Sequence, residues 1–221
     1  MRLPMILMAV FMVTTLMPAF GDNTTWTVDP MHSSVEFTIR HMMISNVRGQ
    51  FDKVHSTVVY DGKVLEAASV DATIDASSIN THETKRDEHL RNADFFDVAK
   101  YPSITFKSKR IQRLGVGKFK LVGDLTMHGV TKEVVLDVEG PSPEIKDQHG
   151  HARTGASATA SLNRKDFGLM WNGVLESGDV MVGNEVKVSI DVELVKEPAV
   201  KSFQPLARPA RQDISCSQQR L

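Results

Sequence analysis

Apolar and polar residues alternate one by one along most of the chain between residues 34 and 194. The strictest runs are Ser34–His41, Val70–Asp75 and Val186–Leu194, and Val47–Tyr60 is interpreted as one further run. A period of two is that of a β-strand, whose successive side chains point to opposite faces. About eight such runs follow one another, with turn signals such as Asp61-Gly62 between them, so the sequence predicts an antiparallel all-β fold.

Each predicted strand has one apolar and one polar face, and this pattern limits how the sheet can pack. Such a sheet must close on itself or pack on another sheet to bury its apolar face. Closure also removes the exposed edges along which sheets aggregate. We therefore expect one all-β domain over residues 22–196, an eight-stranded antiparallel barrel, because no second hydrophobic unit follows it.

The stretch Ser78–Asp97 interrupts the strand pattern. It is dense in charge, lacks a period of two and ends with the aromatic pair Phe95-Phe96. Thr81 is a residue type that caps helix starts, and Asp87 and Arg91 are spaced like neighbours on one helical face. The stretch has too few apolar residues for a core helix. We expect a short helical cap, inserted between two strands and held at the mouth of the barrel by its aromatic pair.

Both ends of the chain differ from the predicted barrel. Residues 1–21 resemble a signal peptide, with Arg2, then the apolar run Met5–Leu16, then small residues, so we predict cleavage after Gly21. This predicts a periplasmic or secreted protein that does not span the membrane after cleavage, and an uncleaved anchor is the alternative. Residues 197–221 contain prolines and scattered charge without a period, which predicts a disordered tail.

The chain has a single cysteine, Cys216, which lies in this tail. The barrel must therefore be stable without disulfides, even in an oxidising compartment. The residue is interpreted as an incidental free thiol. An intermolecular disulfide through Cys216 is the alternative, and a homodimer stays open.

Charge and motifs argue against several classes of function. The formal net charge is −1 and there is no basic block, so we expect neither a nucleic-acid partner nor attraction to an anionic membrane surface. The motifs of nucleotide-binding proteins, zinc proteases, redox proteins and serine hydrolases are absent from the sequence. His149 and His151 are an alternative metal pair, but they lie in a polar loop without an obvious third ligand. We therefore predict no metal and no cofactor.

The predicted strand Arg153–Leu162 bears on what the barrel encloses. Its inward face carries Ala156, Ala158 and Ala160, where a solid core would usually have larger side chains. Small side chains leave volume for an apolar ligand or for large residues from the opposite wall. Those large residues are Phe37, Phe51, Phe106 and Phe119. The pattern alone leaves both alternatives open.

Several short motifs in a fixed order make the chain resemble the YceI-like family over about residues 24 to 196. The motifs are the whole cap stretch, Trp26-Thr-Val-Asp29, His32-Ser33, Val47-Arg-Gly-Gln-Phe51, Tyr101-Pro-Ser-Ile-Thr-Phe106, Gly123-Asp-Leu-Thr-Met-His-Gly-Val-Thr131 and Asn163-Arg-Lys-Asp-Phe-Gly168. The resemblance implies an exported bacterial protein with a lipocalin-like barrel and a helical segment at one end. It also implies an elongated apolar pocket for long isoprenoid or acyl chains, with no catalytic residue and no metal.

We therefore predict a lipid-binding protein rather than an enzyme, with a long-chain isoprenoid or fatty-acyl amphiphile as its partner in the barrel. The predicted apolar wall consists of Val35, Phe37, Ile39, Phe51, Ile74, Phe106, Phe119, Leu121, Val134, Leu136, Ala156, Ala158, Ala160, Val188 and Ile190. The candidates for contacting the polar head group are His32, His41, Arg86, Asp87 and Arg164.

Two other functions stay open. An enzyme acting on an envelope lipid would use His41, Asp87 or His89 as an acid–base group. A structural envelope module would have a barrel filled by side chains. The head-group candidates have structural alternatives as well, because His32 would fit a hydrogen-bonded turn and Asp87 would fit a residue that fixes the cap.

Overall fold

The computed structural model describes residues 24–176, 178 and 180–198 of the 221-residue chain. The predicted signal peptide and Cys216 lie outside the described residues. Of the predicted tail, only Glu197 and Pro198 are described, and they directly follow the last strand.

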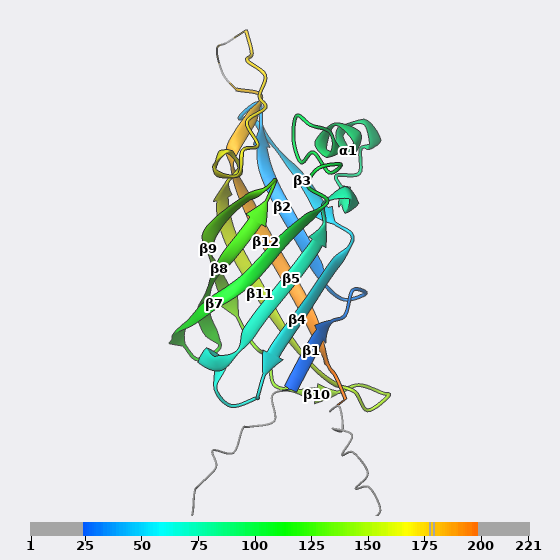
Figure 1. Ribbon diagram of the computed structural model, residues 1–221, viewed down its shortest axis with the longest axis vertical. Helices are drawn as coiled ribbons and strands as arrows, with labels where there is room; N and C mark the ends of the chain where they lie inside the picture. The colour runs from blue at the N-terminus through cyan, green and yellow to red at the C-terminus, as the bar shows by residue number, and fades with distance from the viewer. Residues whose placement is uncertain (1–23, 177, 179, 199–221) are drawn as a thin grey trace, which may run out of the picture.

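Eight strands close into one antiparallel barrel (Figure 1). They are β1 (Thr24–Val28), β4 (Val54–Tyr60), β5 (Ser69–Asp75), β7 (Ser103–Gly115), β8 (Lys118–Met127), β9 (Val130–Glu139), β11 (Ala152–Asn163) and β12 (Val182–Lys196). Around the ring the order is β11, β9, β8, β7, β5, β4, β1 and β12, and the pairing of β12 with β11 closes it. The predicted fold class is confirmed, because the alternating residues form strands whose apolar faces meet inside the closed sheet.

Three further strands extend the wall at one end, β2 (Ser34–His41), β3 (Ser45–Phe51) and β6 (Ile79–Asn80). The long strand β12 pairs with β1 near its C-terminal end and with β2 along the rest of the same edge. β3 pairs with β2, and β6 pairs with β3. The single run predicted over Val47–Tyr60 is therefore two strands, β3 and β4, which pair with different neighbours.

The predicted cap contains one helix, α1 (Thr84–Arg91), between β6 and β7. In Figure 1 it lies at the upper end of the barrel, near β3. The predicted helix start is wrong, because Glu83 rather than Thr81 is the N-cap and its carboxylate accepts from the Arg86 amide at 2.7 Å. No helix in the described part of the chain combines the length and apolar character needed to cross a bilayer.

Of the partners expected for Asp87, which were Arg86, Arg91 or a backbone amide, the structure shows a backbone amide. The buried carboxylate of Asp87 accepts from the Thr81 amide at 2.9 Å and from the Thr81 hydroxyl. The Arg91 guanidinium donates to the carbonyls of Ser77 and Ile79, each at 2.7 Å. Both side chains therefore tie α1 back to the segment around β6 instead of to each other.

Two clusters of buried apolar side chains lie toward the two ends of the barrel. The lower cluster, at the end where β12 finishes, contains Leu65, Ile111, Phe119, Leu121, Val138 and Ala158. The upper cluster, at the α1 end, contains Ala76, Ile104, Met127, Val134, Phe167 and Leu169. Short elements supply some of these residues or flank the ring, namely η1 (Leu65–Ala67), η2 (Ala76–Ser78), η3 (Arg164–Phe167) and β10 (Ile145–Lys146).

Candidate functional site

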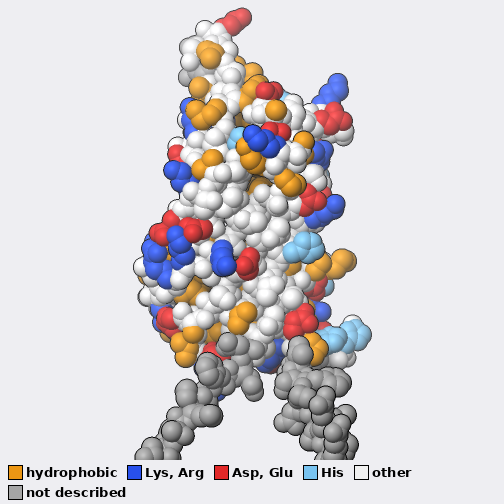
Figure 2. Space-filling view, viewed as in Figure 1, with side chains coloured by type: hydrophobic (Ala, Val, Ile, Leu, Met, Phe, Trp, Pro, Cys, Tyr) orange, Lys and Arg blue, Asp and Glu red, His pale blue; other side chains and the backbone are white. Residues whose placement is uncertain are grey.

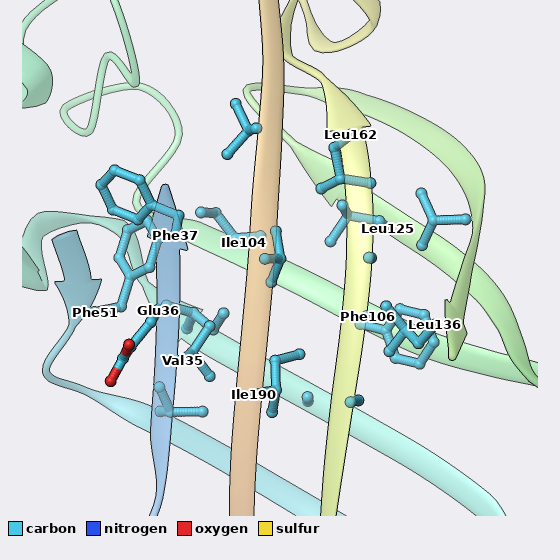
Figure 3. Close-up of a pocket in the computed structure, with 18 of the residues that line it drawn as sticks. Val35, Glu36, Phe37, Phe51, Ile104, Phe106, Leu125, Leu136, Leu162 and Ile190 are labelled. Atoms are coloured by element: carbon cyan, nitrogen blue, oxygen red, sulfur yellow. The ribbon is translucent and has the colours of Figure 1, made fainter. Parts of the chain in front are cut away.

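The barrel encloses a cavity of about 500 Å³. The inward faces of its strands form the wall, and every residue predicted for the apolar wall lines the cavity. Figure 3 shows Phe37 of β2, Leu136 of β9 and Ile190 of β12 turned toward a common space. Glu36, between two inward residues of β2, points away from that group, as the alternation of a strand requires.

Wall residues in the middle of the barrel face open space. Val35, Phe37, Val188 and Ile190 point inward but remain partly exposed. By contrast, Phe119 in the lower cluster is only 7% exposed. Because an inward side chain of a closed barrel is exposed mainly to the interior, the partly exposed residues mark a volume that side chains do not fill.

The large aromatic residues are held against the wall instead of crossing the cavity. The rings of Phe37 and Phe51 are 5.9 Å apart, and Phe51 meets Phe96 of the cap edge-on at 5.8 Å. Phe106 packs over Gly123, where an added Cβ would lie 2.5 Å from its ring. Of the two alternatives for the interior, the structure therefore favours the hollow one.

Charged and titratable side chains of the lining lie mainly at the α1 end. At that end lie Arg40, His41, Arg86, His89 and Arg164, whereas Tyr60 packs against the lower cluster and Glu36, also in the lining, points away from the interior. At the lower end the lining is uncharged and includes the buried residues Trp26 and Thr154. The cavity is therefore apolar along most of its length and polar toward α1.

Arg86 brings the helix to the cavity. Its guanidinium donates from Nε to the Thr81 hydroxyl at 2.7 Å and from Nη2 to the Thr81 carbonyl at 2.8 Å. Asp87 binds the same threonine but is not among the residues that line the cavity. Of these two head-group candidates, only Arg86 is placed at the cavity.

Arg164 lines the cavity and is only 3% exposed. Its Nε donates to the Gly183 carbonyl at 2.9 Å, and its Nη1 donates to the carbonyls of Trp171 and Leu169. Its Nη2 has no hydrogen-bond partner within the described residues, and burial lowers the pKa of the guanidinium. Through these three carbonyls, Arg164 holds the segment after η3 against β12.

A group of three rings, of which only Trp171 was not singled out in the sequence, joins α1 to this segment. The His89 ring lies edge-on at 5.0 Å from both Phe95 and Trp171, and its Nε2 is 3.1 Å from Asp94 Oδ2. All three rings line the cavity. Trp171 was missed because the stretch Asn163–Gly183 is irregular and has no period, so its being an aromatic residue in a loop was the only signal.

His32 lies outside the cavity, in the turn between β1 and β2. Its Nδ1 is 3.0 Å from the Asp29 carboxylate, which raises the pKa of the imidazole. Arg153 donates to that carboxylate at 2.6 Å and also binds Glu193, and its guanidinium holds the pKa of the Asp29 carboxyl well below its usual range. His32 therefore belongs to a charged network in the turn, and the structure does not place it at the predicted head-group site.

A closed antiparallel barrel around an apolar cavity, polar toward one end, defines a lipocalin-like barrel of the ligand-binding class. Residues 26–194 match the family model of the YceI-like domain. The chain therefore belongs to the YceI-like family.

Relatives of the chain agree with this assignment. UPF0312 protein SAS2572 of Staphylococcus aureus is 39% identical over 170 residues, which cover 77% of this chain and 96% of the relative. The crystal structure of the Campylobacter jejuni YCEI protein is 32% identical, with a TM-score of 0.62 over 72% of this chain and 91% of that one. A polyisoprenoid binding domain from Saccharophagus degradans is only 18% identical and shares the fold, with a TM-score of 0.58 over 78% and 98% of the two chains.

Proposed function

We propose that this protein binds a long-chain amphiphile, an isoprenoid or a fatty-acyl lipid, inside the barrel and catalyses no reaction. The observation that carries the proposal is the apolar cavity of about 500 Å³. Small-molecule sites typically measure about 300–1,000 Å³, and each buried methylene contributes roughly 0.8 kcal/mol to binding. The Saccharophagus degradans domain, whose name states that it binds a polyisoprenoid, has the same fold and supports the proposal.

The ligand would lie along the barrel with its polar end toward α1. Arg86 and His41 line that end of the cavity and offer hydrogen-bond donors to a head group. The lower end has buried Phe119 and Trp26 in its lining, which suit a hydrocarbon tail.

The placement of the acid–base residues narrows the enzyme alternative. His41 and His89 line the cavity, but the carboxylate of Asp87 is buried against Thr81. A general base must lie within hydrogen-bond reach of the proton that it removes, directly or through one water. Asp87 is therefore not presented to a ligand, and the enzyme alternative is left with His41 or His89.

We also propose that the protein is exported and works in the periplasm or outside the cell, as the predicted signal peptide at residues 1–21 implies. The mass of the intact protein from an exporting host tests this. We expect a mature chain that begins at Asp22, and a mass that still includes residues 1–21 would contradict export with cleavage.

The two tryptophans allow the position of a bound chain to be measured. Trp26 and Trp171 are the only tryptophans, and both line the cavity, Trp26 toward the lower end and Trp171 toward α1. Delipidated protein would be titrated with straight-chain fatty acids and isoprenoid alcohols of increasing length. We expect Trp171 emission to respond to every chain that binds and Trp26 emission to respond only to longer chains.

The variants Trp26→Phe and Trp171→Phe separate the two signals, because each retains one reporter. Each variant is first compared with the wild type by circular dichroism to confirm that the barrel is intact. Unchanged emission from both tryptophans with every chain tested would refute binding inside the barrel.

A further inference from the structure

Apolar side chains reach solvent at the tips of two loops at the α1 end of the barrel. One tip is the turn between β2 and β3, and the other is the segment between η3 and β12. We call these side chains the apolar rim, and they are Met42, Met43, Ile44, Met170, Val174 and Val180, each between 37% and 79% exposed. Figure 2 shows hydrophobic side chains at the surface of the upper end of the molecule.

The β2–β3 turn has a backbone that suits its residues poorly. The Ile44 amide donates to the His41 carbonyl at 3.1 Å, and the two central residues, Met42 and Met43, have φ values of 49° and 59°. Two consecutive left-handed residues form a type I′ turn, for which Asn-Gly is strongly preferred. Folding alone therefore does not explain two exposed methionines here, and strained residues of this kind concentrate at functional sites.

The two loops form one surface beside the α1 end of the cavity. The Met42 amide donates to the Met181 carbonyl at 2.7 Å, and the Met181 amide donates to the Gly173 carbonyl at 2.9 Å. Met181 and His41 both line the cavity, and so does Trp171 on the second loop. The cavity lining therefore continues through these residues into the apolar rim.

We propose that the apolar rim docks on the surface of a phospholipid bilayer, so that a lipid passes between the bilayer and the barrel without crossing water. The proposal rests on the proposed function for the identity of the cargo. An exposed apolar patch marks a protein or membrane contact, and its continuity with a cavity suited to lipid favours the membrane. Methionine is flexible and adapts to irregular surfaces, as a fluid interface requires.

Apolar burial is the driving force in this docking, because the rim residues carry no charge. We therefore expect a neutral bilayer to be sufficient and the binding to persist at high salt. The second loop also carries the exposed Glu176 between Val174 and Val180, so we expect insertion no deeper than the head groups.

Co-sedimentation with phosphatidylcholine vesicles tests the docking. The rim variant combines Met42→Asn, Met43→Gly and Ile44→Thr, which removes three apolar side chains and supplies the Asn-Gly pair that the turn prefers. The control variant, Leu114→Ser with Val116→Ser, changes two well-exposed apolar residues of the β7–β8 turn at the opposite end. We expect the rim variant to bind vesicles roughly tenfold more weakly or worse, and the control to bind like the wild type.

Thermal unfolding of the same variants excludes misfolding as the cause. Asn-Gly adopts the left-handed backbone of this turn with less strain than Met-Met. The rim variant is therefore expected to melt at or above the wild-type temperature while it loses vesicle binding. Wild-type protein that fails to sediment with vesicles would overturn the proposal, as would a rim variant that binds like the wild type. A rim variant that instead breaks up a wild-type oligomer in vesicle-free buffer would also overturn it, since the rim would then be a contact between copies.

The lipid content of each preparation separates this proposal from the proposed function. If the barrel carries lipid and the protein does not bind vesicles, the docking proposal is wrong and the proposed lipid-binding function stands. If the protein binds vesicles through the rim and carries no lipid, the surface is real and the proposed cargo is wrong.

Discussion

Gly49 on β3 lies where two side chains converge on the backbone. A Cβ at this position would be 2.5 Å from Cζ of Phe37 and 2.7 Å from Cγ2 of Thr81. Phe37 belongs to the cavity wall, while Thr81 is the shared partner of Arg86 and Asp87 in the cap. The missing side chain at Gly49 therefore lets the cap pack directly on the barrel.

Replacing Gly49 by alanine tests this contact. We expect Gly49→Ala to lower the free energy of unfolding by about 1–3 kcal/mol, because the added methyl group overpacks the space between Phe37 and Thr81. Urea unfolding would measure the change. Gly115→Ala is the control, since no heavy atom lies within 4 Å of a Cβ there. Equal stability of the two variants would contradict the close packing of the cap.

Ala160 tests whether small side chains create the cavity. It lines the cavity and remains partly exposed, whereas Ala158 is packed in the lower cluster. We expect Ala160→Phe to reduce the bound lipid or shorten the longest chain that binds, at a stability cost below about 1.5 kcal/mol, because the ring enters open volume. Thr159→Phe, on the outward face of the same strand, should leave lipid content unchanged. Solvent extraction followed by mass spectrometry measures the lipid bound to each variant. If Ala160→Phe carried the same lipid as the wild type, the assignment of the wall would be contradicted.

At the scale of elements, the sequence predicted the strands well because their signal is local. The side chains of a strand alternate between its two faces. A short piece of each strand was therefore enough to assign its apolar face to the wall of the cavity. The division of Val47–Tyr60 into β3 and β4 was not predictable, because it depends on β2 and β1 as separate neighbours. A backbone amide was among the expected partners of Asp87, but that it belongs to Thr81 was not predictable, since the two residues meet only in the folded cap.

The charged network around Arg153 connects elements at the outer surface of the lower half. Its Nη1 binds Asp29, which follows β1, as well as Glu193 of β12. Its Nε donates to Asp147, in the turn between β10 and β11, at 2.8 Å. These contacts hold the pKa of the Asp29 and Asp147 carboxyls well below their usual range.

The network predicts how stability depends on pH. A carboxyl whose pKa is lowered on folding contributes its full stabilisation above its ordinary pKa near 4 and loses it as the pH falls through the lower folded value. We expect Arg153→Gln to be clearly less stable than the wild type at pH 7. The difference should shrink below about pH 4, as Asp29 and Asp147 take up protons.

Denaturant unfolding from pH 7 to pH 2 measures this difference. Arg113→Gln is the control, because it removes an exposed ion pair with Glu66 and should change stability little at any pH. A difference between Arg153→Gln and the wild type that stays constant down to pH 2 would show that the carboxylates are not its source.

At the scale of the whole molecule, the structure is a hollow barrel whose two ends differ in chemistry. The lower end has a packed apolar cluster and a charged outer network, whereas the α1 end has cationic and aromatic residues and the apolar rim. An unfilled cavity loses the contacts that its lining atoms would otherwise make. Occupation by a ligand should therefore stabilise the barrel.

This stabilisation can be measured by delipidation. We expect delipidated protein to melt at a lower temperature than protein that keeps its ligand. Addition of a long-chain lipid at about 100 times its dissociation constant should restore about 2.7 kcal/mol of stability. A melting temperature that changes neither on delipidation nor on addition of lipid would argue against a ligand in the interior.

The most direct test of a lipid-filled barrel is native mass spectrometry of the protein purified from its native source. We predict a species heavier than the mature polypeptide by the mass of one amphiphile, which is lost after extraction with organic solvent. A protein that has only the polypeptide mass, both as purified and after incubation with long-chain isoprenoids and fatty acids, would contradict the account.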